Sequence, residues 1–114
     1  MAKILDELVD FAVKYHRGFE VAGKERAKIF LETVAATTIV YQERGKILGF
    51  AIYFERNDKI VFFCIAVKKE LEQNWRAIPI FMKVIEKLPC KPIYYIGNDL
   101  ELKLLKWQKP SQLN

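Results

Sequence analysis

The spacing of apolar residues predicts two amphipathic helices in the first third of the chain. In residues 3–16 apolar side chains recur every three or four positions, which is the period of one helical face. This helix is expected to end near Gly18, and a second helix follows it. The apolar face of the second helix is formed by Ala27, Phe30, Leu31 and Val34.

Three strands are predicted next. "TTIVYQ" (37–42) and "ILGFAIYF" (47–54) are rich in β-branched and aromatic residues, and Gly45 lies in the turn between them. "KIVFFCIAV" (59–67) is a third strand after a second turn. Its continuous apolar run predicts burial on both faces of a sheet.

The last third alternates between helix and strand. Residues 76–88 have helical periodicity, and "IYYI" (93–96) predicts a short strand. "GNDLELKLLKW" (97–107) predicts a final helix with Asn98 or Asp99 as its cap. The order α-α-β-β-β-α-β-α predicts an α/β (α+β layered) fold, with helices on a sheet, in one domain spanning residues 1–114.

Composition narrows the class of protein. The 114 residues are 52% hydrophobic, which excludes a disordered chain. The net charge of +5 comes from scattered residues, which argues against a nucleic-acid partner. There is no apolar run of membrane-spanning length, and the acidic residues of the first ten positions argue against a signal peptide. Two cysteines without CxxC spacing indicate reduced thiols, so a cytoplasmic protein is expected.

Residues with catalytic chemistry are few. His16 is the only histidine, and near a helix end it is typical of a surface or cap residue. One histidine and two separated cysteines make no metal set. A Cys64–His16 pair is left open by the sequence. Tyr94 and Tyr95 are expected on a sheet face, so no catalytic residue is assigned.

Three segments resemble the GNAT superfamily of N-acyltransferases. "VYQERGKILGFAIYF" looks like the family's hairpin, "FFCIAVKKE" like its central strand and "GNDLELKLLKW" like its late helix. The resemblance covers roughly residues 3–108. It implies a GNAT-like mixed sheet that lacks the family's first strand and its last two strands. Short members of this kind resemble proteins encoded by bacteriophages, which implies a virion-associated location as the alternative to the cytoplasm.

The chain departs from the family where the cofactor binds. The family's loop reads Arg/Gln-x-x-Gly-x-Gly/Ala, because small residues let backbone N–H groups reach the pyrophosphate. Here Glu72 takes the basic position, Trp75 takes the first glycine, and only Ala77 matches. Leu105 takes the place of the family's catalytic tyrosine. We therefore expect a degenerate GNAT-like domain, a non-catalytic structural or interaction protein, which binds acetyl-CoA weakly or not at all.

The alternative is an acyl-CoA-dependent N-acyltransferase with an atypical loop. The resemblance then implies acetyl-CoA as the cofactor, whereas no cofactor is expected under the first hypothesis. The implied cofactor-binding residues are Ile65, Ala66, Val67, Gln73, Asn74, Trp75, Arg76, Ala77 and Asn98.

The strands missing relative to the family predict an open sheet edge. "PIYYIG" (92–97) is expected at that edge, with Leu105 and Trp107 contributing exposed apolar surface. A homodimer or another protein partner is the expected occupant. The alternative is a monomer in which residues 108–114 fold back over the edge.

Overall fold

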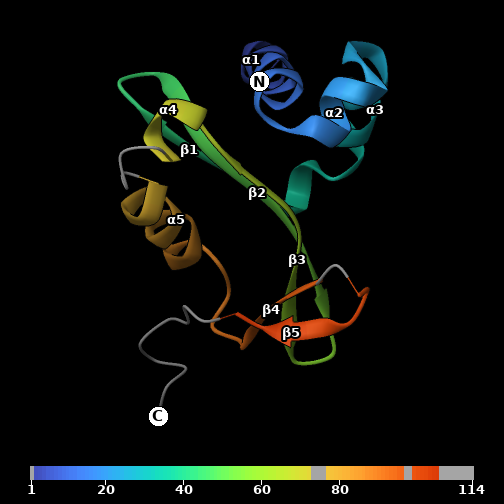
Figure 1. Cartoon of the computed structure of the whole chain (residues 1–114), viewed down its shortest axis with the longest axis vertical. Helices are drawn as coiled ribbons and strands as arrows, with labels where there is room; N and C mark the ends of the chain where they lie inside the picture. Colours follow the sequence, from blue (N-terminus) through green and yellow to red (C-terminus); the bar gives the residue numbers. More distant parts are fainter. Residues whose placement is uncertain (1, 73–76, 97–98, 106–114) are drawn as a thin grey trace.

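A computed structural model describes the backbone of residues 2–72, 77–96 and 99–105, and the side chains of residues 4–70, 79–96 and 99–105. Helices and strands follow one another in a mixed order along the chain (Figure 1). The elements are α1 (Ala2–Tyr15), α2 (Arg17–Ala22), α3 (Lys24–Thr33), the 3-10 turn η1 (Ala35–Thr37), β1 (Thr38–Glu43), β2 (Lys46–Arg56), β3 (Lys59–Val67), α4 (Lys69–Glu72), α5 (Ala77–Glu86), β4 (Ile93–Ile96) and β5 (Leu102–Leu104).

The strands form one five-stranded sheet in the order β1-β2-β3-β4-β5. β1, β2 and β3 are antiparallel neighbours, β3 and β4 are parallel, and β4 and β5 are antiparallel. The predicted α+β class is therefore confirmed, and the strand–helix–strand unit from β3 through α5 to β4 contains the parallel pair. The specific arrangement of the GNAT family stays a prediction.

The predicted second helix is α3, and the structure adds a short helix, α2, that the sequence did not predict. α1 ends at Tyr15, and Gly18 lies inside the short helix α2. Gly23 separates α2 from α3 and has a backbone φ of 90°, which residues other than glycine rarely adopt. The chain therefore turns between α2 and α3, and the first helix ends three residues before the predicted end near Gly18.

The predicted final helix is also wrong, since residues 102–104 form β5. Leu100 has φ of 64°, which is incompatible with a right-handed helix. The side-chain oxygen Oδ1 of Asp99 accepts a hydrogen bond of 3.2 Å from the backbone N–H of Glu101, which stabilises a turn. The chain reverses here and β5 returns along β4. Asn98, the other predicted cap, lies outside the described residues.

Helices lie on both faces of the sheet, α1–α3 on one and α5 on the other (Figure 1). The core under α1–α3 contains Leu8, Val9, Phe11, Ala12, Phe19, Ala27, Leu31, Phe50, Ile52, Cys64 and Ala66. The core under α5 contains Ala51, Ile60, Phe62, Val84, Ile85, Leu88 and Ile93. Successive residues of β2 enter opposite cores because strand side chains alternate between faces.

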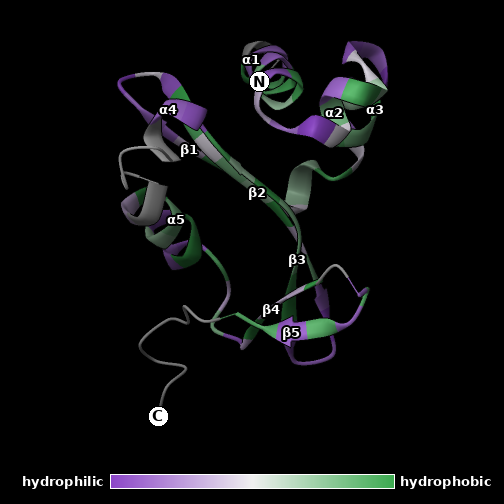
Figure 2. Cartoon of the chain, in the orientation of Figure 1, coloured by the Kyte–Doolittle hydropathy of each residue, from purple (hydrophilic) through white to green (hydrophobic). Residues whose placement is uncertain are grey.

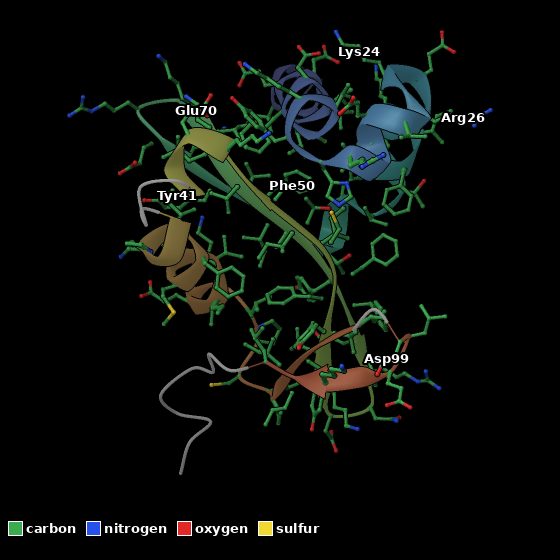
Figure 3. All side chains as sticks on the ribbon, in the orientation of Figure 1. Lys24, Arg26, Tyr41, Phe50, Glu70 and Asp99 are labelled. Carbon is green, nitrogen blue, oxygen red and sulfur yellow. The ribbon has the colours of Figure 1, made fainter. Side chains whose placement is uncertain are left out.

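Phe50 of β2 connects the sheet to the N-terminal helices (Figure 3). Its ring centroid lies 6.0 Å from that of Phe11 on α1 and 6.1 Å from that of Phe19 on α2. Both pairs have the edge-to-face geometry that aromatic rings prefer. The side chain is 1% exposed, so it is a central residue of this core.

Candidate functional site

The junction of β3 and β4 is the first candidate site. The two strands pair only from Ile60 to Phe62 of β3. Phe63 has no opposite residue on β2, because Ile52 pairs with Cys64 and the next residue pairs with Phe62. Phe63 is therefore a β-bulge, which bends the strand that carries it. Beyond the bulge, no described residue pairs with β3 on the β4 side.

The predicted cofactor residues are only partly within the described chain. Residues 65–67 end β3 and pair with β2 on their other side. Ala77 is the first residue of α5, and its side chain is outside the described residues. The segment after Val67 includes the short helix α4, where the sequence predicted a loop. Five predicted contacts lie outside the described residues: Gln73, Asn74, Trp75, Arg76 and Asn98.

An apolar pocket lies between β3 and the helices α2 and α3. It has a volume of about 410 Å³, a size typical of small-molecule sites. In a regular strand Phe63 and Cys64 would face opposite sides, but the bulge turns both toward this pocket. The lining residues are His16, Gly18, Phe19, Ala22, Arg26, Ala27, Phe30, Phe63 and Cys64.

Three phenylalanines form much of the pocket wall. The ring centroid of Phe30 lies 5.8 Å from that of Phe19 and 5.6 Å from that of Phe63. Phe63 is 55% exposed, so the prediction that its strand is buried on both faces is wrong at this residue. The exposed ring belongs to the mouth of the pocket, since it lines the space and also reaches solvent.

His16 contributes a polar atom without a partner. It precedes α2 in the cap position, but its side chain makes no cap hydrogen bond. Nδ1 is buried and has no hydrogen-bond partner. A Cβ atom at Gly18 would lie 3.0 Å from Cε1 of this ring, so only glycine leaves room for the imidazole. Burial lowers the pKa of His16, which favours the neutral ring.

The structure brings His16 and Cys64 to the same pocket, which the sequence left open. Burial raises the pKa of the Cys64 thiol to about 12. The thiol is therefore protonated at neutral pH, and the neighbouring histidine is neutral. A reactive cysteine needs its thiolate, so Cys64 and His16 form part of the pocket wall and do not act as a nucleophile with its base. Neither Cys64 nor Cys90 forms a disulfide, as the sequence predicted.

A second apolar surface lies on β2, β4 and β5, beyond the reach of α1–α3. The register aligns Phe54, Tyr94 and Leu104 across the strands, and Ile96 with Leu102. Directly opposed residues share a face of a sheet. We call these five side chains the open face. Figure 2 shows the apolar colour of β5 at the surface of the molecule.

The sheet edge differs from the predicted one. β4 lies between β3 and β5, so residues 93–96 are not at the edge, and β5 takes that place. Leu105 is half-buried against the α5 core, where the sequence predicted exposure. Its backbone N–H donates a hydrogen bond of 2.8 Å to the carbonyl of Ile93. Trp107 lies outside the described residues.

The remaining polar candidates occupy surface positions. Tyr94 and Tyr95 are sheet-face residues of β4, as predicted. The carboxylate of Glu55 pairs with the ammonium of Lys91 at 2.6 Å. Among the described residues, no group of three or more His, Cys, Asp or Glu could hold a metal ion. No helix in that part of the chain is long and apolar enough to cross a membrane.

Comparison with known proteins gives no match, whether with family models, with curated proteins or with solved structures.

Proposed function

We propose that this chain is a non-catalytic interaction protein, a GNAT-like domain that associates with a second copy of itself through the edge of β5. The observation that carries the proposal is an exposed apolar surface directly beside a strand edge. Such edges accept a strand from another chain, because their N–H and C=O groups on one side lack a strand partner. Within the described residues, β5 pairs only with β4.

The open face has the exposure of a contact surface. Phe54 is 38% exposed, Ile96 41%, Leu102 44% and Leu104 59%. Exposed apolar side chains gathered at one end of a sheet commonly mark an interaction site on a small protein. The outer edge of β5 lies next to this surface, so a strand that pairs with β5 would extend the sheet and continue the open face.

Leu100 supports an interaction at the same end of the molecule. It is 85% exposed and has φ of 64°, where glycine or asparagine is favoured. An apolar side chain at such a position costs folding free energy and gains no burial within the described chain. Contact with another chain would bury this side chain and offset that cost.

Charge selects one pairing of β5 with a second copy. Because side chains alternate along a strand, a two-fold axis that keeps the open faces on one side must pass through a residue of β5, which is Leu102, Lys103 or Leu104. An axis at Leu104 places Lys103 opposite Leu105 and pairs no charges. An axis at Lys103 places two lysines opposite each other. An axis at Leu102 places Glu101 opposite Lys103 twice, which is favourable for a cross-strand pair. The arrangement with the axis at Leu102 is the proposed one.

Light scattering with size-exclusion chromatography tests the proposed dimer. The wild-type chain should have a dimer mass at roughly 50 μM, and Glu101→Lys should shift it toward the monomer by placing like charges opposite each other. The double variant Glu101→Lys with Lys103→Glu should restore the dimer. Glu25→Lys, an equal charge change at an exposed position of α3, is the matched control and should remain dimeric.

Two results would contradict the proposal. A wild-type monomer across the concentration range would remove the homodimer. A Glu101→Lys variant that stays dimeric would place the contact elsewhere on the surface. Restoration by the double variant distinguishes a specific strand register from a general effect of charge.

Acyl-CoA-dependent N-acyltransferase activity is the second candidate function. The observation that favours it is the bulge at Phe63, after which β3 and β4 no longer pair. A pantetheine arm needs such an unpaired strand, since its amides hydrogen-bond with backbone groups, here those of residues 65–67. A thermal-shift titration with acetyl-CoA tests this candidate, because a ligand of the native state raises the melting temperature. An unchanged melting temperature at millimolar acetyl-CoA removes it.

A further inference from the structure

The pocket between β3, α2 and α3 has a composition that selects a ligand class. Its wall is almost entirely apolar, with Phe19, Phe30 and Phe63 as the large side chains. A volume of about 410 Å³ holds roughly 14 groups of the size that water occupies in the liquid. The space therefore suits a short apolar chain or a single ring system.

Among the described residues of the lining, Arg26 supplies the only permanent charge. Figure 3 shows its side chain projecting from α3 at the outer side of the molecule. Arg26 lines the pocket and is an exposed residue, as expected for an arginine whose stem packs on apolar surface while its charge stays in water. The lining residues that the structure describes include no carboxylate.

The neighbouring lysines of α3 differ from Arg26 in their partners. The ammonium of Lys24 lies 2.7 Å from Asp10, and that of Lys28 lies 3.8 Å from Asp6. Arg26 forms no ion pair with any described carboxylate. Its guanidinium thus remains available for an anion, and arginine binds carboxylates with two parallel hydrogen bonds.

His16 also lines the pocket and carries a buried polar atom. Nδ1 of His16 is buried without a partner, although buried polar atoms are nearly always hydrogen-bonded. The imidazole lines the same pocket as Cys64 and Arg26. Because this atom is buried, Arg26 alone among the described lining residues offers a charged contact to a ligand.

We propose that the pocket binds a small monocarboxylate with an apolar body, which packs against the three phenylalanines while its carboxylate pairs with Arg26. This site is separate from the proposed self-association and does not depend on it. A second pocket, lined in part by α1, is similar in volume but differs in charge. It has about 390 Å³ and a mostly apolar wall, and its described lining residues include Glu32 but no cation. An anion should therefore prefer the pocket at Arg26.

Isothermal titration calorimetry with octanoate, and with octanol as its uncharged counterpart, tests the assignment. Octanoate should bind with a Kd below about 1 mM, and octanol should bind more weakly. Arg26→Gln should weaken octanoate roughly tenfold, the loss of one charge-assisted contact, and leave octanol unchanged. Lys28→Gln removes an equal charge from the same helix and should leave both affinities unchanged.

A second variant locates the site independently of charge. Ala22→Leu adds volume to the pocket wall and should abolish octanoate binding, whereas Ala36→Leu, at an exposed position outside the pocket, should not. Equal octanoate affinity in wild type and Arg26→Gln would overturn the proposed carboxylate contact. Unchanged binding in a folded Ala22→Leu variant, or no octanoate binding at millimolar concentration, would overturn the site itself.

Discussion

Replacing Phe50 by alanine tests how the N-terminal helices are held to the sheet. The side chain is 1% exposed and its ring contacts those of Phe11 and Phe19, so the substitution removes buried apolar surface and leaves a cavity between three elements. Phenylalanine-to-alanine changes at such positions cost about 3–5 kcal/mol of unfolding free energy. The total for a domain of this size is only about 5–15 kcal/mol.

Phe54→Ala is the matched control, because it makes the same chemical change on the same strand and on the same sheet face. Phe54 is 38% exposed and lies on the open face, where α1–α3 do not reach. Its loss should cost about 1 kcal/mol. Both variants are best made in the Glu101→Lys background, so that self-association does not contribute to the measured stability.

Urea unfolding followed by circular dichroism measures both effects. Phe50→Ala should lower the midpoint without changing the slope m, and its melting temperature should fall by about 12–20 °C at roughly 4 °C per kcal/mol. Equal losses for Phe50→Ala and Phe54→Ala would refute the reasoning, because they would mean that helices cover the whole face. A loss below about 1.5 kcal/mol for Phe50→Ala would refute its central place in the core.

Three further predictions concern single residues. Burial raises the pKa of Cys64 to about 12, so roughly one part in 10,000 of this thiol is thiolate at pH 8. Ellman's reagent should therefore titrate only the exposed Cys90 in the native chain, and both thiols after unfolding. Burial lowers the pKa of His16, so the unfolded chain binds a proton on this residue more readily than the native chain. The free energy of unfolding should therefore fall as the pH drops below about 6.5 and become constant below the lowered pKa. The variant His16→Gln should remove this pH dependence. Gly49→Ala should cost about 1–3 kcal/mol in urea unfolding, since the added Cβ would lie 3.1 Å from the carbonyl oxygen of Ala66; a neutral result would mean that β2 and β3 separate easily.

The sequence by itself determined the strands with the strongest apolar signal. Residues 59–67 and 93–96 are strands with the predicted bounds, because each is a short run of β-branched and aromatic residues between turn signals. The turn at Gly45 also follows from local chemistry, since that residue and Arg44 both have positive φ. These features depend on neighbours in the chain and were therefore readable from it.

In the segment after β4, a helix was predicted although the alternation of apolar and charged residues fits a strand. Leu100, Leu102 and Leu104 alternate with the charged Glu101 and Lys103, which is the period of a strand. The same leucines are also compatible with a helical face, and β5 forms because β4 offers an edge on which to pair. Pairing with a distant strand overrides a weak local preference.

Only the tertiary structure decided where the candidate sites lie. His16 and Cys64 are far apart in sequence and line one pocket, because the chain places the start of α2 beside β3 and the bulge at Phe63 turns the cysteine and its neighbour toward the same space. Phe50 and Phe54 have the same residue type and face in the sequence pattern, yet one is buried and the other exposed. Periodicity gives the face of a strand, but the extent of the covering helices depends on contacts between elements that no local pattern encodes.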